Sequence, residues 1–191
     1  SKTKTIEDIM NAYNCGQRLF GENRVQELTD KYSNLPKDIK WNMIGHLQSN
    51  KVKYIAPFVD LIHSLDSLRL AKEIDKQGEN NDRIINCLIQ IKISKEESKY
   101  GVSVDDFDQF YKHIDDLKYI NVVGLMGMAS FTNDKKIIIN EFKLISSLYN
   151  KLKLVNKNFK YLSIGMSNDY KLAINEGGNM IRIGSRIFGE R

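Results

Sequence analysis

Length, composition and charge narrow the classes to which this chain can belong. It has 191 residues, of which 41% are hydrophobic and 28% are charged, so it can bury the core of one globular domain and is too apolar for a disordered chain. The 29 basic residues exceed the 24 acidic ones by five and are spread along the chain, whereas nucleic-acid-binding domains gather them into a stripe. We therefore expect a single folded domain that does not bind nucleic acid.

Membrane, secreted and metal-binding proteins are also disfavoured. No apolar run approaches the ~18 residues of a membrane span, and no apolar segment of a signal peptide follows the polar start at residues 1–5. Cys15 and Cys87 are far apart, and neither belongs to a CxxC or zinc-ligand pattern. We expect a cytoplasmic protein with two reduced thiols, no membrane contact and no metal.

Short apolar strands alternate with amphipathic helices along the chain. The first helical stripe stops before Gly16, a residue type that ends helices well, and Asp66 stands where a cap of the fourth helix is expected. Strands are expected at residues 18–21, 41–45, 59–63, 85–93, 122–128, 161–165 and 180–184. Helices are expected at 6–13, 25–32, 47–55, 68–74, 104–114 and 138–152, with a short one after residue 168.

This alternation predicts an α/β fold with a parallel sheet and right-handed crossovers. A TIM-like (β/α)8 barrel has eight strands, and seven can be counted here. The polar residues 1–5 precede the first helix in the position that a loop after a strand takes in the other units. We therefore expect residues 1–191 to form a single barrel domain whose first strand lies upstream of Ser1. A doubly wound open sheet is the alternative, but the units are short and no nucleotide-binding fingerprint is present.

The segments after the last two strands have the pattern of a phosphate site. Residues 163–169 (SIGMSND) lead into the short helix, and residues 182–185 (RIGS) end the last strand. In a parallel barrel these loops border the active face and often hold phosphate. Glycine lets an anion approach backbone N–H groups closely, and serine adds a hydroxyl donor. Tight turns with polar caps are the structural alternative.

Two cationic side chains are candidates for the same face. Strand alternation directs Arg182 into the barrel, where its partner is either a ligand or a carboxylate such as Glu22. Lys2 falls at the end of the expected upstream strand, where a shielded amine can form a Schiff base with a carbonyl. A plain surface lysine is the alternative, and Lys4 competes for the role.

Two histidines also follow strand ends, namely His46 and His63. No Ser/His/Asp set and no pair of carboxylates accompanies them in a pattern that indicates catalysis. We interpret both as hydrogen-bonded structural residues.

Several segments form a combination that is more specific than any one of them. They are SKTK (1–4), FGENRVQE (20–27), WNMIGHLQSNK (41–51), IQIKIS (89–94), SKYG (98–101), GLMGMA (124–129), SIGMSND (163–169) and IRIGSRIFG (181–189). Together they resemble the pyridoxal-phosphate (PLP) homeostasis proteins, single-domain relatives of the N-terminal barrel of alanine racemase, which has the type III PLP fold. The resemblance covers essentially the whole chain, although Ile164 stands where this family usually has methionine.

The resemblance implies a cofactor, PLP, and a role for each of seven residues. Lys2 would form a Schiff base with PLP, Asn23 would lie beside the ring, and Arg182 would face the pyridine nitrogen. The phosphate would be held by the side chain of Ser167 and by backbone groups of Met166, Gly184 and Ser185.

The resemblance also implies binding rather than turnover. An arginine stays protonated, with a pKa above ~12, so Arg182 would donate a hydrogen bond to the pyridine nitrogen without giving up its proton. An unprotonated ring is a weaker electron sink. Racemases of this fold take a catalytic tyrosine from a second domain, for which a chain ending at Arg191 has no room.

We therefore expect a monomeric protein that stores and delivers PLP, with PLP-requiring apo-enzymes as recipients. A weak amino-acid racemase that uses Lys2 as its base is one alternative. A PLP-free barrel that binds phosphate ligands or other proteins is the other.

Overall fold

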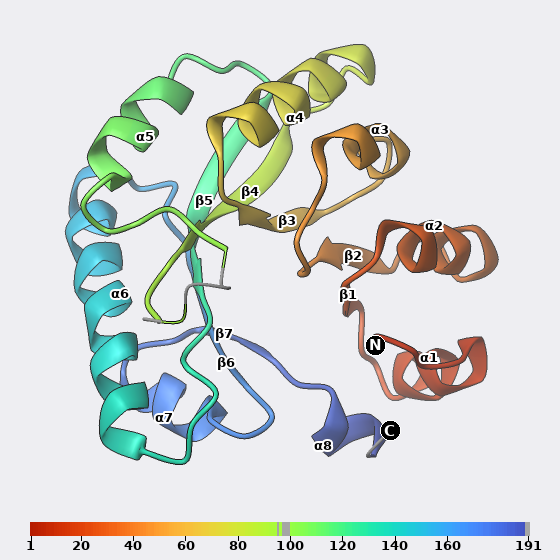
Figure 1. Ribbon diagram of the computed structural model, residues 1–191. Coiled ribbons are helices and arrows are strands. Elements are labelled where there is room, and N and C mark those ends of the chain that lie inside the picture. Colours follow the sequence, from red (N-terminus) through yellow and green to blue (C-terminus); the bar gives the residue numbers. More distant parts are fainter. Residues whose placement is uncertain (95, 97–99, 190–191) are drawn as a thin grey trace.

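In the computed structural model of this protein, seven parallel strands form one sheet and helices connect them (Figure 1). The structure describes residues 1–94, 96 and 100–189, so Ser98 and Lys99 of the SKYG segment lie outside the described residues, as does Arg191. The strands pair in chain order from the first to the seventh. A doubly wound sheet reverses its strand order at a switch point, so this order excludes the open-sheet alternative and fits a barrel.

The strands begin and end within two residues of the predicted positions. They are β1 Leu19–Glu22, β2 Lys40–Met43, β3 Leu61–Leu65, β4 Ile85–Ile91, β5 Ile120–Gly127, β6 Tyr161–Met166 and β7 Met180–Arg182. Apolar runs that end in glycine or polar residues thus located every one of them.

The helices also follow the predicted stripes. They are α1 Ile6–Asn14, α2 Val25–Asn34, α3 Val52–Ile55 with the 3-10 turn η1 Ser49–Lys51 before it, α4 Leu68–Asn80, α5 Phe107–Ile114, α6 Lys135–Val155, α7 Tyr170–Asn175 and α8 Ser185–Phe188. Gly16 follows α1 with a φ of 96°, as its predicted role requires. The prediction of Asp66 as the cap of α4 is wrong, because Ser67 accepts the hydrogen bond from the Leu70 N–H.

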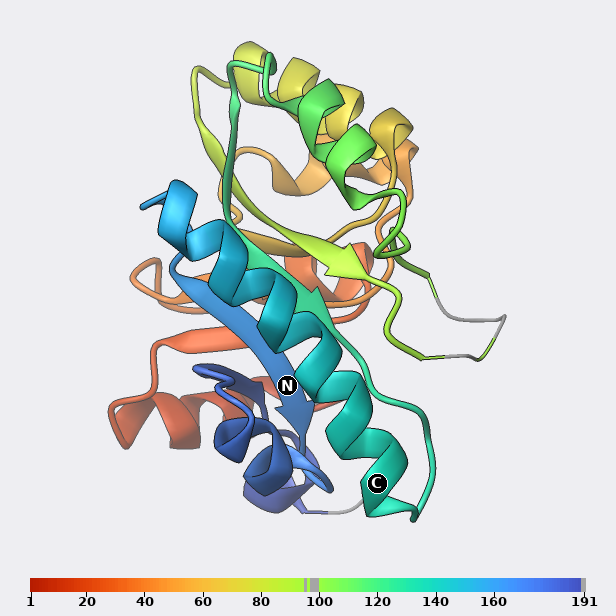
Figure 2. The ribbon, with the colours of Figure 1, turned by 90° about the vertical axis from the view of Figure 1, so that its left-hand side faces the viewer.

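Both faces of the sheet are covered by apolar side chains. A large cluster between the sheet and the helices contains Trp41, Phe107 and Phe142, and Figure 2 shows α6 lying across this outer face. A small cluster of Leu61, Leu88, Val123 and Met126, with Met128 and Met180 against it, is separate. Because strand neighbours of these residues belong to the large cluster, the small one fills the inside of the curved sheet.

The N-terminal segment connects the two edge strands, β1 and β7. The amino group of Ser1 donates to the carbonyl of Gly21 in β1 at 2.9 Å. Lys4 Nζ donates at 2.7 Å to the carbonyl of Phe188, the last residue of α8, which follows β7. Lys2 therefore lies between the two edges of the seven-stranded sheet. Within the part of the chain that the structure describes, no helix combines the length and hydropathy needed to cross a bilayer.

Candidate functional site

The predicted site residues gather at the carboxyl ends of the strands. Asn23 directly follows β1, Ser167 directly follows β6, and Arg182 is the last residue of β7. Parallel strands point their carboxyl ends to one edge, where binding loops of α/β barrels meet. The bond from Lys4 to Phe188 connects the Lys2 segment to the end of α8, the helix that follows β7, so all seven residues border one face.

The loops after β6 and β7 form a small cradle of polar groups. The buried hydroxyl of Ser167 accepts from the Gly184 N–H at 3.2 Å, and the Ser167 carbonyl accepts from Arg186 Nε at 2.7 Å. The N–H groups of Ser185 and Arg186, which open α8, have no acceptor among the described residues. A Cβ on Gly184 would meet nothing within 4 Å. Free N–H groups beside open space are suited to an anion.

The backbone of Met166 is engaged differently from the other predicted phosphate ligands. Its N–H donates to Asp169 Oδ1 at 2.6 Å, so that donor is already satisfied. We therefore expect Met166 to contribute least to the cradle.

Arg182 is held from inside the barrel by neighbouring strands. Its Nη1 donates to the carbonyl and the hydroxyl of Ser163 at 2.8 and 2.7 Å, and its Nη2 donates to the carbonyl of Gly127 at 3.0 Å. Burial lowers the pKa of Arg182 to about 10, against the opposing effect of Asp169, so it is charged at neutral pH. The alternative of an ion pair between Arg182 and Glu22 is wrong, because Glu22 pairs with Lys31 at 2.8 Å.

His63 extends this hydrogen-bonded chain across the barrel. Its Nδ1 lies 3.1 Å from Ser163 Oγ and its Nε2 lies 3.2 Å from Asn42 Oδ1. Burial, aided by the charge of Arg182, lowers the pKa of His63 to about 3, so the ring is neutral. We assign the proton to Nε2, since Nδ1 can then accept from the hydroxyl that itself accepts from Arg182. Strands β2, β3, β6 and β7 are thus joined by one polar chain.

His46 is hydrogen-bonded too, at the same edge of the sheet. Its Nδ1 lies 3.2 Å from Asp66 Oδ2, and its ring stacks on Tyr100 with centroids 3.8 Å apart. Both histidines are therefore hydrogen-bonded, as expected from the sequence. Among the described residues, no group of three His, Cys, Asp or Glu side chains is placed to hold a metal ion.

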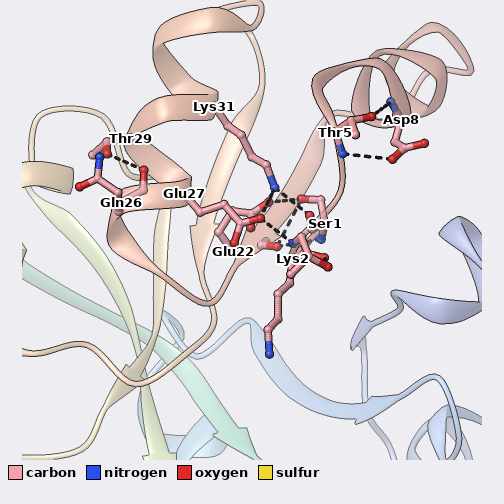
Figure 3. Close-up of polar contacts among 11 residues, drawn as sticks. Ser1, Lys2, Thr5, Asp8, Glu22, Gln26, Glu27, Thr29 and Lys31 are labelled. Carbon is pink, nitrogen blue, oxygen red and sulfur yellow. Dashed lines mark hydrogen bonds and ion pairs between the residues drawn. The ribbon is translucent and has the colours of Figure 1, made fainter. Parts of the chain in front are cut away.

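The Lys2 side chain has no polar partner in the described part of the chain. The backbone groups on either side of Lys2 are hydrogen-bonded. Lys31 Nζ donates to the Ser1 carbonyl at 2.8 Å, and the Thr3 N–H donates to Glu27 Oε1 at 2.5 Å. Figure 3 shows Lys2 extending away from Glu27 and Lys31. Sequence reasoning missed these two α2 residues, because a Glu and a Lys four apart on a helix are typical of a solvated surface pair.

The backbone around Asn23 is tightly placed. A Cβ on Gly45 would lie 2.4 Å from the Asn23 carbonyl oxygen, so only glycine lets the loop after β2 approach so closely. The site thus presents a free amine, a fixed cation and free N–H groups on one face. These groups suit a small molecule with an aldehyde, an acceptor nitrogen and a phosphate.

Comparison with known proteins assigns the family. Residues 3–191 match the family described as the alanine racemase N-terminal domain. The whole chain is 39% identical to the pyridoxal phosphate homeostasis protein of Aquifex aeolicus (strain VF5), 85% of which it covers. The chain belongs to the pyridoxal phosphate homeostasis protein family.

Solved structures agree with this assignment. The chain superposes on PipY of Synechococcus elongatus PCC7942 with a TM-score of 0.92 for the form without PLP and 0.88 for the form with PLP bound. These two are 33% and 32% identical to it, and each comparison covers 99% of this chain and 90% of the other. An alanine racemase of Clostridium difficile 630 shares the fold at a TM-score of 0.76 and 13% identity, over 96% of this chain and 47% of the racemase.

Proposed function

We propose that this protein binds PLP through a Schiff base with Lys2 and takes part in PLP homeostasis by storing and delivering the cofactor, without catalytic turnover. The observation that carries the proposal is the unpartnered amine of Lys2 on the same face as Arg182 and the start of α8. The names of the curated relatives and the PLP-bound form of PipY support it.

The groups present fit PLP from one end to the other. PLP supplies an electrophilic aldehyde on an electron-withdrawing ring. Lys2 would hold this aldehyde as a Schiff base, whose formation would release the aldehyde oxygen as water. Asn23 borders the ring. The phosphate is held by the Ser167 hydroxyl and the free N–H of Ser185, with the backbone of Gly184 and Met166 beside them.

Arg182 favours storage over turnover. Its charge persists at neutral pH, because burial lowers its pKa only to about 10. Its contacts with Ser163 and Gly127 fix the guanidinium as a hydrogen-bond donor, so it holds a ring nitrogen without transferring a proton to it. The competing proposal of a weak amino-acid racemase predicts exchange of substrate α-protons into deuterated water, and none is expected.

The biological setting is also part of the proposal. We place residues 1–191 in the cytoplasm as one PLP-binding domain, monomeric in solution, with PLP-requiring apo-enzymes as recipients. Cys15 and Cys87 are both free thiols, which suits a reducing compartment. Light scattering of the purified chain tests the monomer.

The deciding experiment compares Lys2→Ala with Lys72→Ala, a matched change at an exposed lysine of α4. The parent and Lys72→Ala are expected to gain a visible absorbance band with PLP, which borohydride abolishes, while Lys2→Ala gains none. A parent that ignores PLP but binds inorganic phosphate would favour the PLP-free module instead.

A further inference from the structure

Helix α2 holds the peptide groups on both sides of Lys2. Lys31 Nζ donates to the Ser1 carbonyl, and the Thr3 N–H donates to Glu27 Oε1. The two α2 side chains are themselves joined, with 2.7 Å between Lys31 Nζ and Glu27 Oε1 (Figure 3). The backbone of Lys2 is therefore fixed from both directions while its side chain is left free.

These contacts hold the backbone at Thr3 in a conformation of unfavourable energy. Thr3 has a φ of 63°, in the left-handed region that a β-branched residue rarely adopts. Such backbone strain persists only where surrounding contacts over-determine it, and it concentrates at functional sites. The bond from the Thr3 N–H to a carboxylate is charge-assisted and is thus among the stronger hydrogen bonds available.

The two α2 residues are held rigidly themselves. The ammonium of Lys31 has three acceptors for its three donors, namely the Ser1 carbonyl, Glu22 Oε1 and Glu27 Oε1. The Lys31 side chain is 7% exposed and that of Glu22 is fully buried. Burial raises the pKa of Glu27, but the hydrogen bonds from Lys31 and Thr3 outweigh burial and keep that pKa below its usual range. Glu27 is therefore charged at neutral pH.

We propose that Glu27 and Lys31 are positioning residues that fix the backbone of Lys2 so that its amine meets the aldehyde of PLP. This inference rests on the proposed function and deepens it. In this proposal α2 positions the lysine that binds PLP covalently, while the loops after β6 and β7 bind the phosphate. Lys31 has no free donor left, so it does not compete with Lys2 for the aldehyde.

The test compares two ligands on the same variants. PLP forms a covalent bond with Lys2, whereas pyridoxine 5′-phosphate, which has a hydroxymethyl group in place of the aldehyde, binds without one. Glu27→Ala is expected to weaken PLP binding by about tenfold, the effect of losing a hydrogen bond to a charged group, and to leave pyridoxine 5′-phosphate binding unchanged. Glu27→Gln keeps an acceptor without the charge and is expected to lose less.

The control is Gln26→Ala on the same helix, whose side chain bonds to Asp30 and to no other residue that the structure describes, and both affinities should stay at the parent level. Unchanged PLP binding in Glu27→Ala would overturn the proposal. An equal loss for both ligands would also overturn it, because it would indicate damage to the whole site. A parent that never attaches PLP to Lys2 would instead refute the proposed function, and this inference with it. Circular dichroism confirms that each variant is folded.

Discussion

Arg182 and Ser163 face each other inside the barrel, where Nη1 of the arginine donates to both the hydroxyl and the carbonyl of the serine. Two acceptors on one residue restrict the direction in which the guanidinium points. Because the same hydroxyl reaches His63, a cation at the end of β7 is oriented from β6 and β3. A binding group that must meet a ring nitrogen at a defined angle needs this kind of support.

Removing the Ser163 hydroxyl is therefore expected to cost stability. Ser163→Ala removes an acceptor from a buried N–H of Arg182 and a donor from the buried Nδ1 of His63, and it should lower the free energy of unfolding by about 1–3 kcal/mol. Ser64→Ala is the matched control on β3, since Ser64 Oγ is buried with no hydrogen-bond partner among the described residues, and it should be neutral or stabilising. Urea unfolding of both variants measures the difference, and equal losses would contradict this account.

The buried neutral ring of His63 makes stability depend on pH. The ordinary pKa of 6.5 applies in the unfolded chain and the folded value is about 3. Between these values the unfolded chain binds a proton that the native state does not. The free energy of unfolding therefore falls as pH drops below 6.5, by up to about 1.4 kcal/mol per pH unit from this residue.

His63→Gln should remove that dependence while lowering stability at neutral pH. The measurement is urea unfolding at several values between about pH 5 and pH 7, above the range where carboxylates titrate. We expect the variant to show the shallower slope. Parallel slopes for the parent and the variant would show that His63 takes up its proton in the folded state.

The cradle proposed for phosphate leads to a prediction opposite to that for α2. Ser167→Ala removes the hydroxyl beside the Gly184 N–H and should weaken PLP and pyridoxine 5′-phosphate alike, by about tenfold for a lost hydrogen bond to a charged group. Titration calorimetry with both ligands measures the two losses. An effect on PLP alone would place Ser167 at the aldehyde and not at the phosphate.

The backbone strain at Thr3, beside Lys2, can be relieved by substitution. Asn adopts positive φ more readily than a β-branched residue, so Thr3→Asn should raise the free energy of unfolding by up to about 1 kcal/mol. Thr3→Val keeps the branching and loses the bond from Thr3 Oγ1 to the Lys2 carbonyl, so it should be less stable than the parent. Thermal melts rank the three proteins, and the reverse order would show that Thr3 is not strained.

The sequence predicted most of the fold because its signals are local. All seven strands were visible as apolar runs, and Gly16 ended α1 as its residue type suggests. Four-residue α8 was missed, since a single turn has no periodicity to detect. The choice of Ser67 over Asp66 as the cap of α4 depends on side-chain geometry, which spacing does not reveal.

The site was predictable only where residue types alone indicate a role. Loops rich in glycine and serine marked the cradle after β6 and β7 that we propose for phosphate, and alternation directed Arg182 inward. Its partners, Ser163 and Gly127, come from other strands and could not be read from spacing, so Glu22 was wrongly considered. The roles of Glu27 and Lys31 were hidden because burial, and not sequence, separates them from an ordinary surface pair.

The most direct test of this account locates the covalent bond. The parent is incubated with PLP, reduced with borohydride, digested and sequenced by mass spectrometry. Because Lys4 Nζ is engaged by the Phe188 carbonyl and Lys31 has its three acceptors, the phosphopyridoxyl group is expected on Lys2. A label on Lys4 or on another lysine, with Lys2 unmodified, would contradict the central claim.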